Sequence, residues 1–188
     1  MKKMNHVLTC SLLLLFAVSA FSQTSSDHKS VADVFNASLS NAEREFVSAA
    51  EAMPADKYTF APTNGEFTGV RTFALQVRHV ASANYEFGSV ILGEKNPVEM
   101  GSQENGADSL KSKDEIVKYL KDSFAYLHKA MDSLTEQNLV TPIKSPWGKT
   151  PLTRLQVAIL AEAHPFDHYG QMVEYLRANN IVPPASRR

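Results

Sequence analysis

The stretch SKDEIVKYLKDSFAYLHKAMDSL, residues 112–134, carries the clearest sign of the fold. It opens with a capping box, because the Ser112 hydroxyl can accept from the Glu115 N–H while the glutamate reaches back to the serine N–H. Apolar residues then recur every three or four positions: Ile116, Leu120, Phe124, Leu127, Met131 and Leu134. This spacing predicts an amphipathic helix that buries one face against a partner.

Three further segments have the same helical periodicity, at residues 30–53, 70–93 and 150–180. The last is expected to begin at Thr150-Pro151, a suitable N-cap and first helical residue. It should end near Asn179-Asn180, because the prolines that follow could not continue the helix.

The four segments together predict the fold class. No stretch alternates convincingly enough to be a strand, and each amphipathic helix can bury its apolar face only against the others. We therefore expect an all-α four-helix bundle. The connections between the helices are long for simple hairpins, so one or more of them could cross an end of the bundle, and the pattern alone leaves the topology open.

The N-terminus reads as an export signal. A basic start precedes the apolar run VLTCSLLLLFAVSA of residues 7–20, and small residues follow at the spacing of a signal cleavage site. The run is too short for a comfortable membrane span, although a retained anchor is the alternative. We expect residues 1–22 to be a signal peptide and residues 23–188 to be a periplasmic or extracellular domain without a membrane span.

Composition excludes several kinds of site from the mature domain. The only cysteine, Cys10, lies within the signal, so no disulfide, thiol nucleophile or cysteine metal ligand is expected after cleavage. The formal net charge of −1 becomes more negative when Lys2 and Lys3 leave with the signal. This mild acidity argues against a nucleic-acid partner, which needs a basic face.

His164 and His168 stand four residues apart in the last helical segment. On a helix they differ by about 40° and share the inward stripe with Val157, Leu160, Gln171 and Tyr175. Two imidazoles at this spacing can converge on one metal ion. The alternative is a pair of buried histidines that are only hydrogen-bonded. Pro165, between them, removes a backbone donor and should make the helix kinked or bulged there.

A third ligand would make the prediction of a metal site more specific. His79, in the second segment, lies one residue past the apolar stripe, so it either flanks the helix in solvent or faces a groove beside the core. Three histidines plus an open position are typical of catalytic zinc, and nickel or iron(II) also accept imidazoles. Protons should compete for such ligands below about pH 6.5. Of the other histidines, His28 lies near the mature N-terminus and His128 is expected on a solvated flank.

Four stretches carry a resemblance to a known family, and they cover nearly all of the mature chain: MPADKYTFAPT, FALQVRHVASANYEF, SPWGKTPLTRLQ and HPFDHYGQMVEYLRANNIVPPAS. In their order and spacing the chain resembles the DinB family, within the DinB/YfiT-like metalloenzyme superfamily. The resemblance implies a four-helix bundle with one divalent metal ion, zinc or nickel first and iron next. Its three ligands would be His79, His164 and His168. Tyr169 departs from many relatives, which have histidine or arginine beside the last ligand.

Two kinds of chemistry on an unidentified small-molecule substrate are expected, and the resemblance implies the first of them. Some relatives are thiol-dependent transferases or isomerases, whereas a metal-dependent hydrolase suits an exported protein better. Glu86, Glu162 and Asp167 are candidate helpers that could equally be solvated carboxylates, so no catalytic residue is assigned. The alternative is a non-catalytic, metal-stabilised bundle that acts as an interaction module or homodimer. A further set of residues is expected to plug the bundle ends rather than bind substrate: Tyr58, Phe60 and Trp147.

Overall fold

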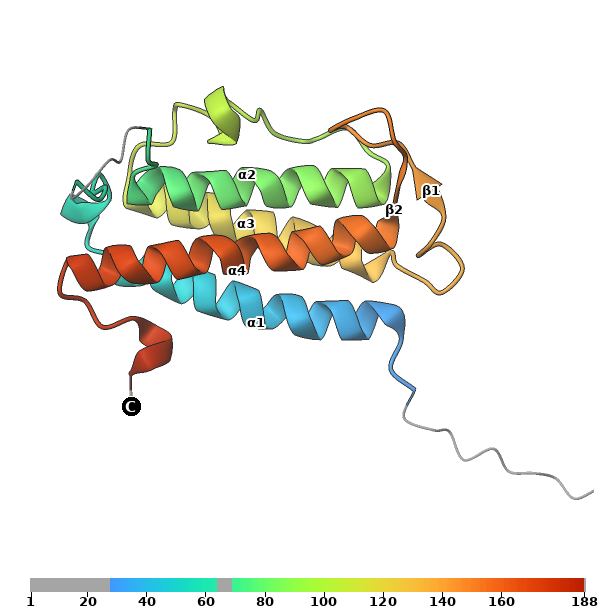
Figure 1. The fold of residues 1–188 in the computed structure, drawn as a ribbon, viewed down its shortest axis with the longest axis horizontal. Helices are drawn as coiled ribbons and strands as arrows, with labels where there is room; N and C mark the ends of the chain where they lie inside the picture. The colour runs from blue at the N-terminus through green and yellow to red at the C-terminus, as the bar shows by residue number, and fades with distance from the viewer. Residues whose placement is uncertain (1–27, 64–68, 188) are drawn as a thin grey trace, which may run out of the picture.

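The computed structural model describes residues 28–63 and 69–187, so the predicted signal peptide lies outside the described residues. Within these ranges the chain forms four α-helices (Figure 1): α1 (Val31–Ala52), α2 (Phe73–Leu92), α3 (Lys113–Asp132) and α4 (Arg154–Ala178). Short elements occupy the connections and the C-terminal tail: the 3-10 turns Ala55–Lys57, Ser102–Glu104 and Pro184–Ser186, and the strands β1 (Pro142–Ile143) and β2 (Leu152–Thr153).

The four helices pack as a bundle, which confirms the all-α prediction. α1 and α2 each pack against both α3 and α4, so α1 and α2 occupy opposite corners. The connection from α1 to α2 therefore crosses one end of the bundle, and the connection from α3 to α4 crosses the other. The core is formed by fully buried side chains from all four helices, among them Phe46, Phe73, Phe124 and Met172. No helix in the described part of the chain is long and apolar enough to cross a membrane.

The helix ends follow local capping chemistry. The capping box predicted at Ser112 is present, with the Glu115 N–H and carboxylate both bonded to the serine. A second box at Ser30 opens α1. The second helix begins at Phe73, three residues later than expected, because the Thr72 hydroxyl caps it by accepting from the Leu75 N–H.

The predicted start of the last helix is wrong. The N-cap is Thr153 rather than Thr150, because Thr153 shares a capping box with Gln156 in which each side chain bonds the other residue's backbone N–H. The expectation of no strand is also wrong in this segment. Thr153 pairs with Pro142, and Leu152 pairs with Ile143, in a two-stranded antiparallel ladder that leads into α4.

The helix α4 continues across Pro165. All residues from Arg154 to Ala178 are α-helical, so no bulge interrupts the helix at Pro165, and the expected kink stays a prediction. Proline removes one backbone donor and crowds the carbonyl of Ala161, four residues before it. The buried side chains on either side of it, Ala161 and Met172 among them, are held by the other helices, and tertiary packing of this kind supplies most of a helix's stability.

Candidate metal centre

The three predicted ligands come together where α2 packs against α4. His79 lies near the middle of α2, and His164 and His168 lie on successive turns of α4. His79 and His168 are buried, at 6% and 7% exposure, whereas His164 is half-buried. Leu160, expected on the same inward stripe, is instead 46% exposed. The histidines therefore lie at the margin of the core, where a bound ion could still meet a ligand from solvent.

The imidazoles face one another through the same ring atom. The Nε2 atom of His164 lies 3.2 Å from that of His79 and 3.1 Å from that of His168. One potential ligand atom from each ring lies within 4.8 Å of the other two. Three imidazole nitrogens this close, and drawn from two helices, could hold one metal ion.

Hydrogen bonds fix two of the three rings. The His79 Nδ1–H donates to the backbone carbonyl of Glu104 at 3.1 Å, and the His168 Nδ1–H donates to Gln76 Oε1 at 2.7 Å. Gln76 is itself held, since its amide donates to Gln171 Oε1 at 2.8 Å. When Nδ1 of a neutral imidazole carries the proton, Nε2 presents a bare lone pair. Both rings thus point lone pairs at the His164 ring.

His164 differs from the other two. Its Nδ1 atom is buried without a hydrogen-bond partner among the described residues, although a metal ligand is expected to place this atom on a carbonyl, carboxylate or water. Its ring meets the ring of Phe87 edge-on, with centroids 5.6 Å apart. Packing against Phe87 thus orients His164, whereas hydrogen bonds orient the other two rings.

Burial keeps all three rings neutral at ordinary pH. It lowers the pKa of His164 to about 3 and that of His168 to about 4, and it also lowers the pKa of His79. The positive charge of Arg71 lowers each of these pKa values further. Neutral imidazole is the form that binds a metal ion.

The donor set fits a divalent cation on chemical grounds. At least two lone pairs converge on the point between the Nε2 atoms, and they repel one another unless a positive charge lies there. A single proton on His164 could satisfy only one or two of these contacts. A divalent ion would satisfy all three, and three nitrogen ligands leave a coordination position open.

The three carboxylates considered as catalytic helpers, Glu86, Glu162 and Asp167, lie in different surroundings. Glu86 is half-buried, and burial raises its pKa, an effect that a hydrogen bond from Trp147 partly offsets. Burial also raises the pKa of Glu162, but the residue that offsets this shift is Ser38 of α1, so Glu162 faces away from the α2–α4 interface. Asp167 is exposed and accepts from Gln171 at 3.5 Å. Of the three, Glu162 is therefore the one whose carboxylate lies toward α1.

Two of the three predicted aromatic plugs pack at one end of the bundle. Tyr58 is buried against Phe73 with centroids 5.3 Å apart, and Phe60 packs on Tyr175 at 5.8 Å. The prediction is wrong for Trp147, which is 42% exposed and packs on Phe87 at 5.6 Å. Because the Phe87 ring contacts His164, Trp147 extends an aromatic wall that begins at the histidine cluster.

Three groups around the site were not predicted from the sequence: Gln76, Arg71 and the Glu104 carbonyl. Gln76 could have been found, since it lies one helical turn before His79 and would face the same partner helix. The Glu104 carbonyl had no such signal, because only the path of the α2–α3 connection brings it to His79.

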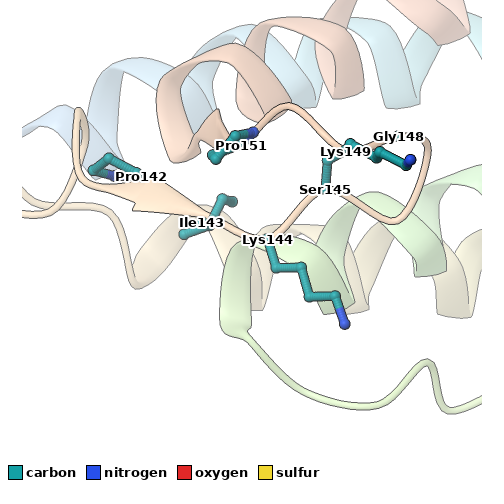
Figure 2. Close-up of a pocket in the computed structure, with 7 residues that line it drawn as sticks. All are labelled: Pro142, Ile143, Lys144, Ser145, Gly148, Lys149 and Pro151. Carbon is teal, nitrogen blue, oxygen red and sulfur yellow. The ribbon is translucent and has the colours of Figure 1, made fainter.

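A separate hollow of ≈ 540 Å³ lies beside the strand pair (Figure 2). It is lined by residues of the α3–α4 connection: Pro142, Ile143, Lys144, Ser145, Gly148, Lys149 and Pro151. None of the three histidines lines this hollow, so it is distinct from the candidate metal centre.

Fold and site together define a helical bundle with a three-histidine cluster between two of its helices. The family model described as the DinB superfamily matches residues 38–172, and the chain belongs to that superfamily. No curated protein is significantly similar to it in sequence.

Solved structures of similar fold agree with this assignment. A DinB-like protein of Bacillus subtilis is 18% identical, with a TM-score of 0.60 over 82% of this chain and 99% of the other. A DinB-like protein of Bacillus cereus is 17% identical, with a TM-score of 0.62 over 80% and 93%. A conserved protein of Enterococcus faecalis is 17% identical, with a TM-score of 0.63 over 80% and 97%. At these identities the likeness concerns the fold.

Proposed function

We propose that the chain binds one divalent metal ion through the Nε2 atoms of His79, His164 and His168. Zinc or nickel is the first expectation, and iron(II) also suits imidazole ligands. The convergence of the three Nε2 atoms supports this proposal, because two of the rings have Nδ1 committed to protein acceptors and present lone pairs to the third.

We infer a metal-dependent hydrolase or transferase acting on a small molecule. A divalent ion with an open position supplies Lewis-acid chemistry and lowers the pKa of a water or thiol ligand. Around it, Gln76 and the Glu104 carbonyl orient two of the rings, and Phe87 with Trp147 gives the site one apolar wall. Glu86, with a raised pKa beside Trp147, is the acid–base candidate nearest this wall.

Export is part of the proposal. The basic start and short apolar run of residues 1–22 support a cleaved signal, and an extracytoplasmic location favours hydrolysis over reactions that need a cytoplasmic thiol pool. Mass spectrometry of the exported protein should find a chain that begins near Gln23. Recovery of the mature protein with residues 1–22 attached would refute the export step and leave the metal site untouched.

Metal analysis of the purified protein tests the function. We expect about one equivalent of zinc, nickel or iron per chain, in keeping with a single three-ligand site. Removal of the ion should leave the helical circular dichroism signal largely intact while abolishing an activity found in a hydrolase and thiol-transferase screen. A protein that unfolds on removal of the metal would instead be a metal-stabilised interaction module, and one that binds no metal would refute the proposal.

A further inference from the structure

The connection between α2 and α3 contains a strained turn. Gln103 and Glu104 are consecutive non-glycine residues with positive φ, 53° and 60°, in the left-handed region that side chains disfavour. Gly101 and Gly106, at φ 66° and 70°, flank them. Left-handed residues of this kind persist only where the surrounding structure fixes them, and they gather at functional sites. Two features should therefore account for this turn: the contacts that hold it, and the group that it places.

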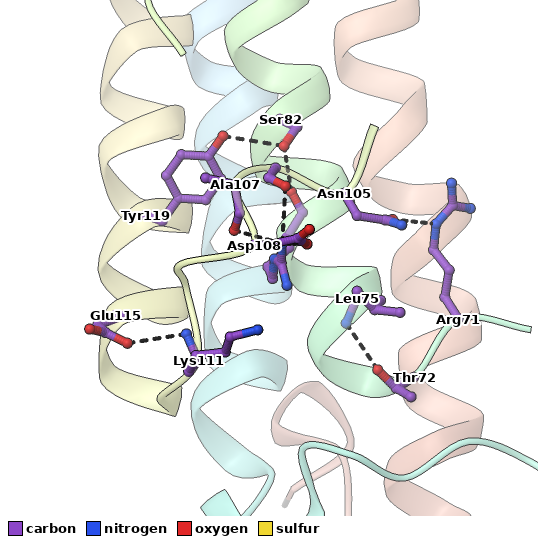
Figure 3. Close-up of polar contacts among 12 residues, drawn as sticks. Arg71, Thr72, Leu75, Ser82, Asn105, Ala107, Asp108, Lys111, Glu115 and Tyr119 are labelled. Atoms are coloured by element: carbon purple, nitrogen blue, oxygen red, sulfur yellow. Dashed lines mark hydrogen bonds and ion pairs between the residues drawn. The ribbon is translucent and has the colours of Figure 1, made fainter. Parts of the chain in front are cut away.

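Two arginines of the α2 region hold the turn. Arg71 donates from Nε to Asn105 Oδ1 at 2.9 Å, as Figure 3 shows, and from Nη2 to the Gln103 carbonyl at 3.1 Å. Arg78 donates to the Gly106 carbonyl at 3.0 Å. The planar guanidinium of Arg71 thus bonds to Gln103 and Asn105, the residues on both sides of Glu104. A lysine side chain could not reproduce this geometry.

The residue between these two contacts is the one that reaches the metal centre. The Glu104 carbonyl accepts from His79 Nδ1 at 3.1 Å. Arg71 is also tied to the opposite side of the site, because the buried Tyr175 of α4 donates its hydroxyl to the Arg71 carbonyl at 2.9 Å. The chain of contacts therefore runs from α4, through Arg71 and the turn, to the imidazole of α2.

We propose that residues 101–106 form a clasp that aims the Glu104 carbonyl at His79, and that Arg71 is the positioning residue that holds the clasp. The clasp fixes the His79 tautomer and ring angle so that Nε2 faces His164. This inference rests on the proposed metal-binding function, since the purpose of the clasp is to hold a ligand ready. It assigns Arg71 no contact with substrate.

Because Arg71 is positively charged, the direction in which metal affinity changes on its removal tests this proposal. The guanidinium lies close enough to the cluster to add to the effect of burial on all three histidines. If Arg71 acted only through its charge, its removal would relieve repulsion of a cation and tighten metal binding. If Arg71 acts through the clasp, its removal loosens a metal ligand and weakens binding.

The experiment is zinc titration of the full mature chain against a competing chelator. Arg71→Gln and Asn105→Ala should each weaken zinc binding by about 10- to 100-fold, the usual cost of losing a partner behind a ligand. Asn105→Ala removes the contact without changing charge, and it carries the test if Arg71→Gln does not fold. The matched control is Arg154→Gln, because Arg154 also donates to a backbone carbonyl, that of Ile91 at 3.0 Å, at the other end of α2. Its zinc affinity should be unchanged.

A second readout uses the metal-free protein. Nitrogen-15 NMR of the wild type should show His79 as the Nδ1–H tautomer alone, and both variants should show a mixture. Equal or tighter zinc binding by both variants, with a single tautomer, would overturn the clasp. If the wild type binds no zinc, the proposed function fails, and the tautomer populations still decide whether the clasp exists.

Discussion

Histidines occur in two different environments of the bundle, and the contrast shows what makes one a ligand. His128 of α3 has both ring nitrogens committed to α1, with Nδ1 against Asn36 Oδ1 and Nε2 3.2 Å from Glu43 Oε2. In the α2–α4 cluster the Nδ1 atoms of His79 and His168 bond to oxygen acceptors, that of His164 has no hydrogen-bond partner among the described residues, and every Nε2 atom faces another histidine.

The two environments differ in what they leave unsatisfied. Both partners of His128 are side-chain oxygen atoms of α1, so its ring ties two helices together without any ion. The cluster instead gathers lone pairs that no group in the described protein neutralises. A histidine with both nitrogens bonded to protein oxygens therefore links two helices, whereas three rings whose Nε2 atoms converge, two of them held through Nδ1, are prepared for a cation.

The largest expected effect comes from removing a ligand. His164→Ala or His168→Ala should reduce zinc affinity by more than about 100-fold, beyond the usual effect of losing a partner behind a ligand, because two imidazoles hold zinc poorly. Metal content of the purified variants, measured by mass spectrometry, checks this. His128→Ala is the matched control and should keep full metal content. An His164→Ala,His168→Ala double variant that retained one equivalent would refute the comparison.

The parts of this site that could be predicted from sequence are those set by helical spacing. The i, i+4 relation places His164 and His168 on one side of α4 wherever the helix begins. The wrong start at Thr150 therefore did not affect the prediction of these two ligands. The capping box at Ser112 was predictable because its partners lie three residues apart.

The remaining features depend on connections with no regular repeat. The clasp needs a left-handed path at Gln103 and Glu104, residues that give no local signal for it. Trp147 was misplaced for the same reason, since an aromatic residue in a connection can pack at a bundle end or along a helix. Only the folded path of the α3–α4 connection brings it to Phe87.

The next effect is a loss of stability in acid. The cluster pKa values, about 3 for His164 and about 4 for His168, lie below the ordinary value of 6.5. The unfolded chain therefore binds more protons, and the free energy of unfolding of the metal-free protein should fall as pH drops from 6.5 toward 4. Each of these two histidines contributes up to about 1.4 kcal/mol per pH unit. Urea unfolding at successive pH values measures the slope.

Variants separate the cluster from other acid-sensitive groups. His164→Leu should reduce the slope between pH 6.5 and 4, whereas His128→Ala should leave the contribution of the cluster in place. The low pKa values also move proton competition for the folded site below the pH of about 6.5 expected from sequence. A metal-free protein whose stability is flat over this range, or whose slope is unchanged in His164→Leu, would show that these rings are not held neutral.

The smallest effect should come from the partner behind His168. Gln76→Met removes the acceptor of the Nδ1–H, which frees the ring to turn or to change tautomer, and should weaken zinc binding by about 10- to 100-fold. Gln76→Glu keeps an acceptor at the same place and adds the negative charge that often backs a metal-bound histidine, so it should retain binding. Asn36→Ala is the matching change at His128, because it removes the Nδ1 partner of that ring. It should leave zinc affinity unaltered. Chelator competition measures all three variants. If Gln76→Met and Asn36→Ala bound zinc equally well, an anchored Nδ1 would not be what distinguishes the cluster, and convergence of the Nε2 atoms alone would account for binding.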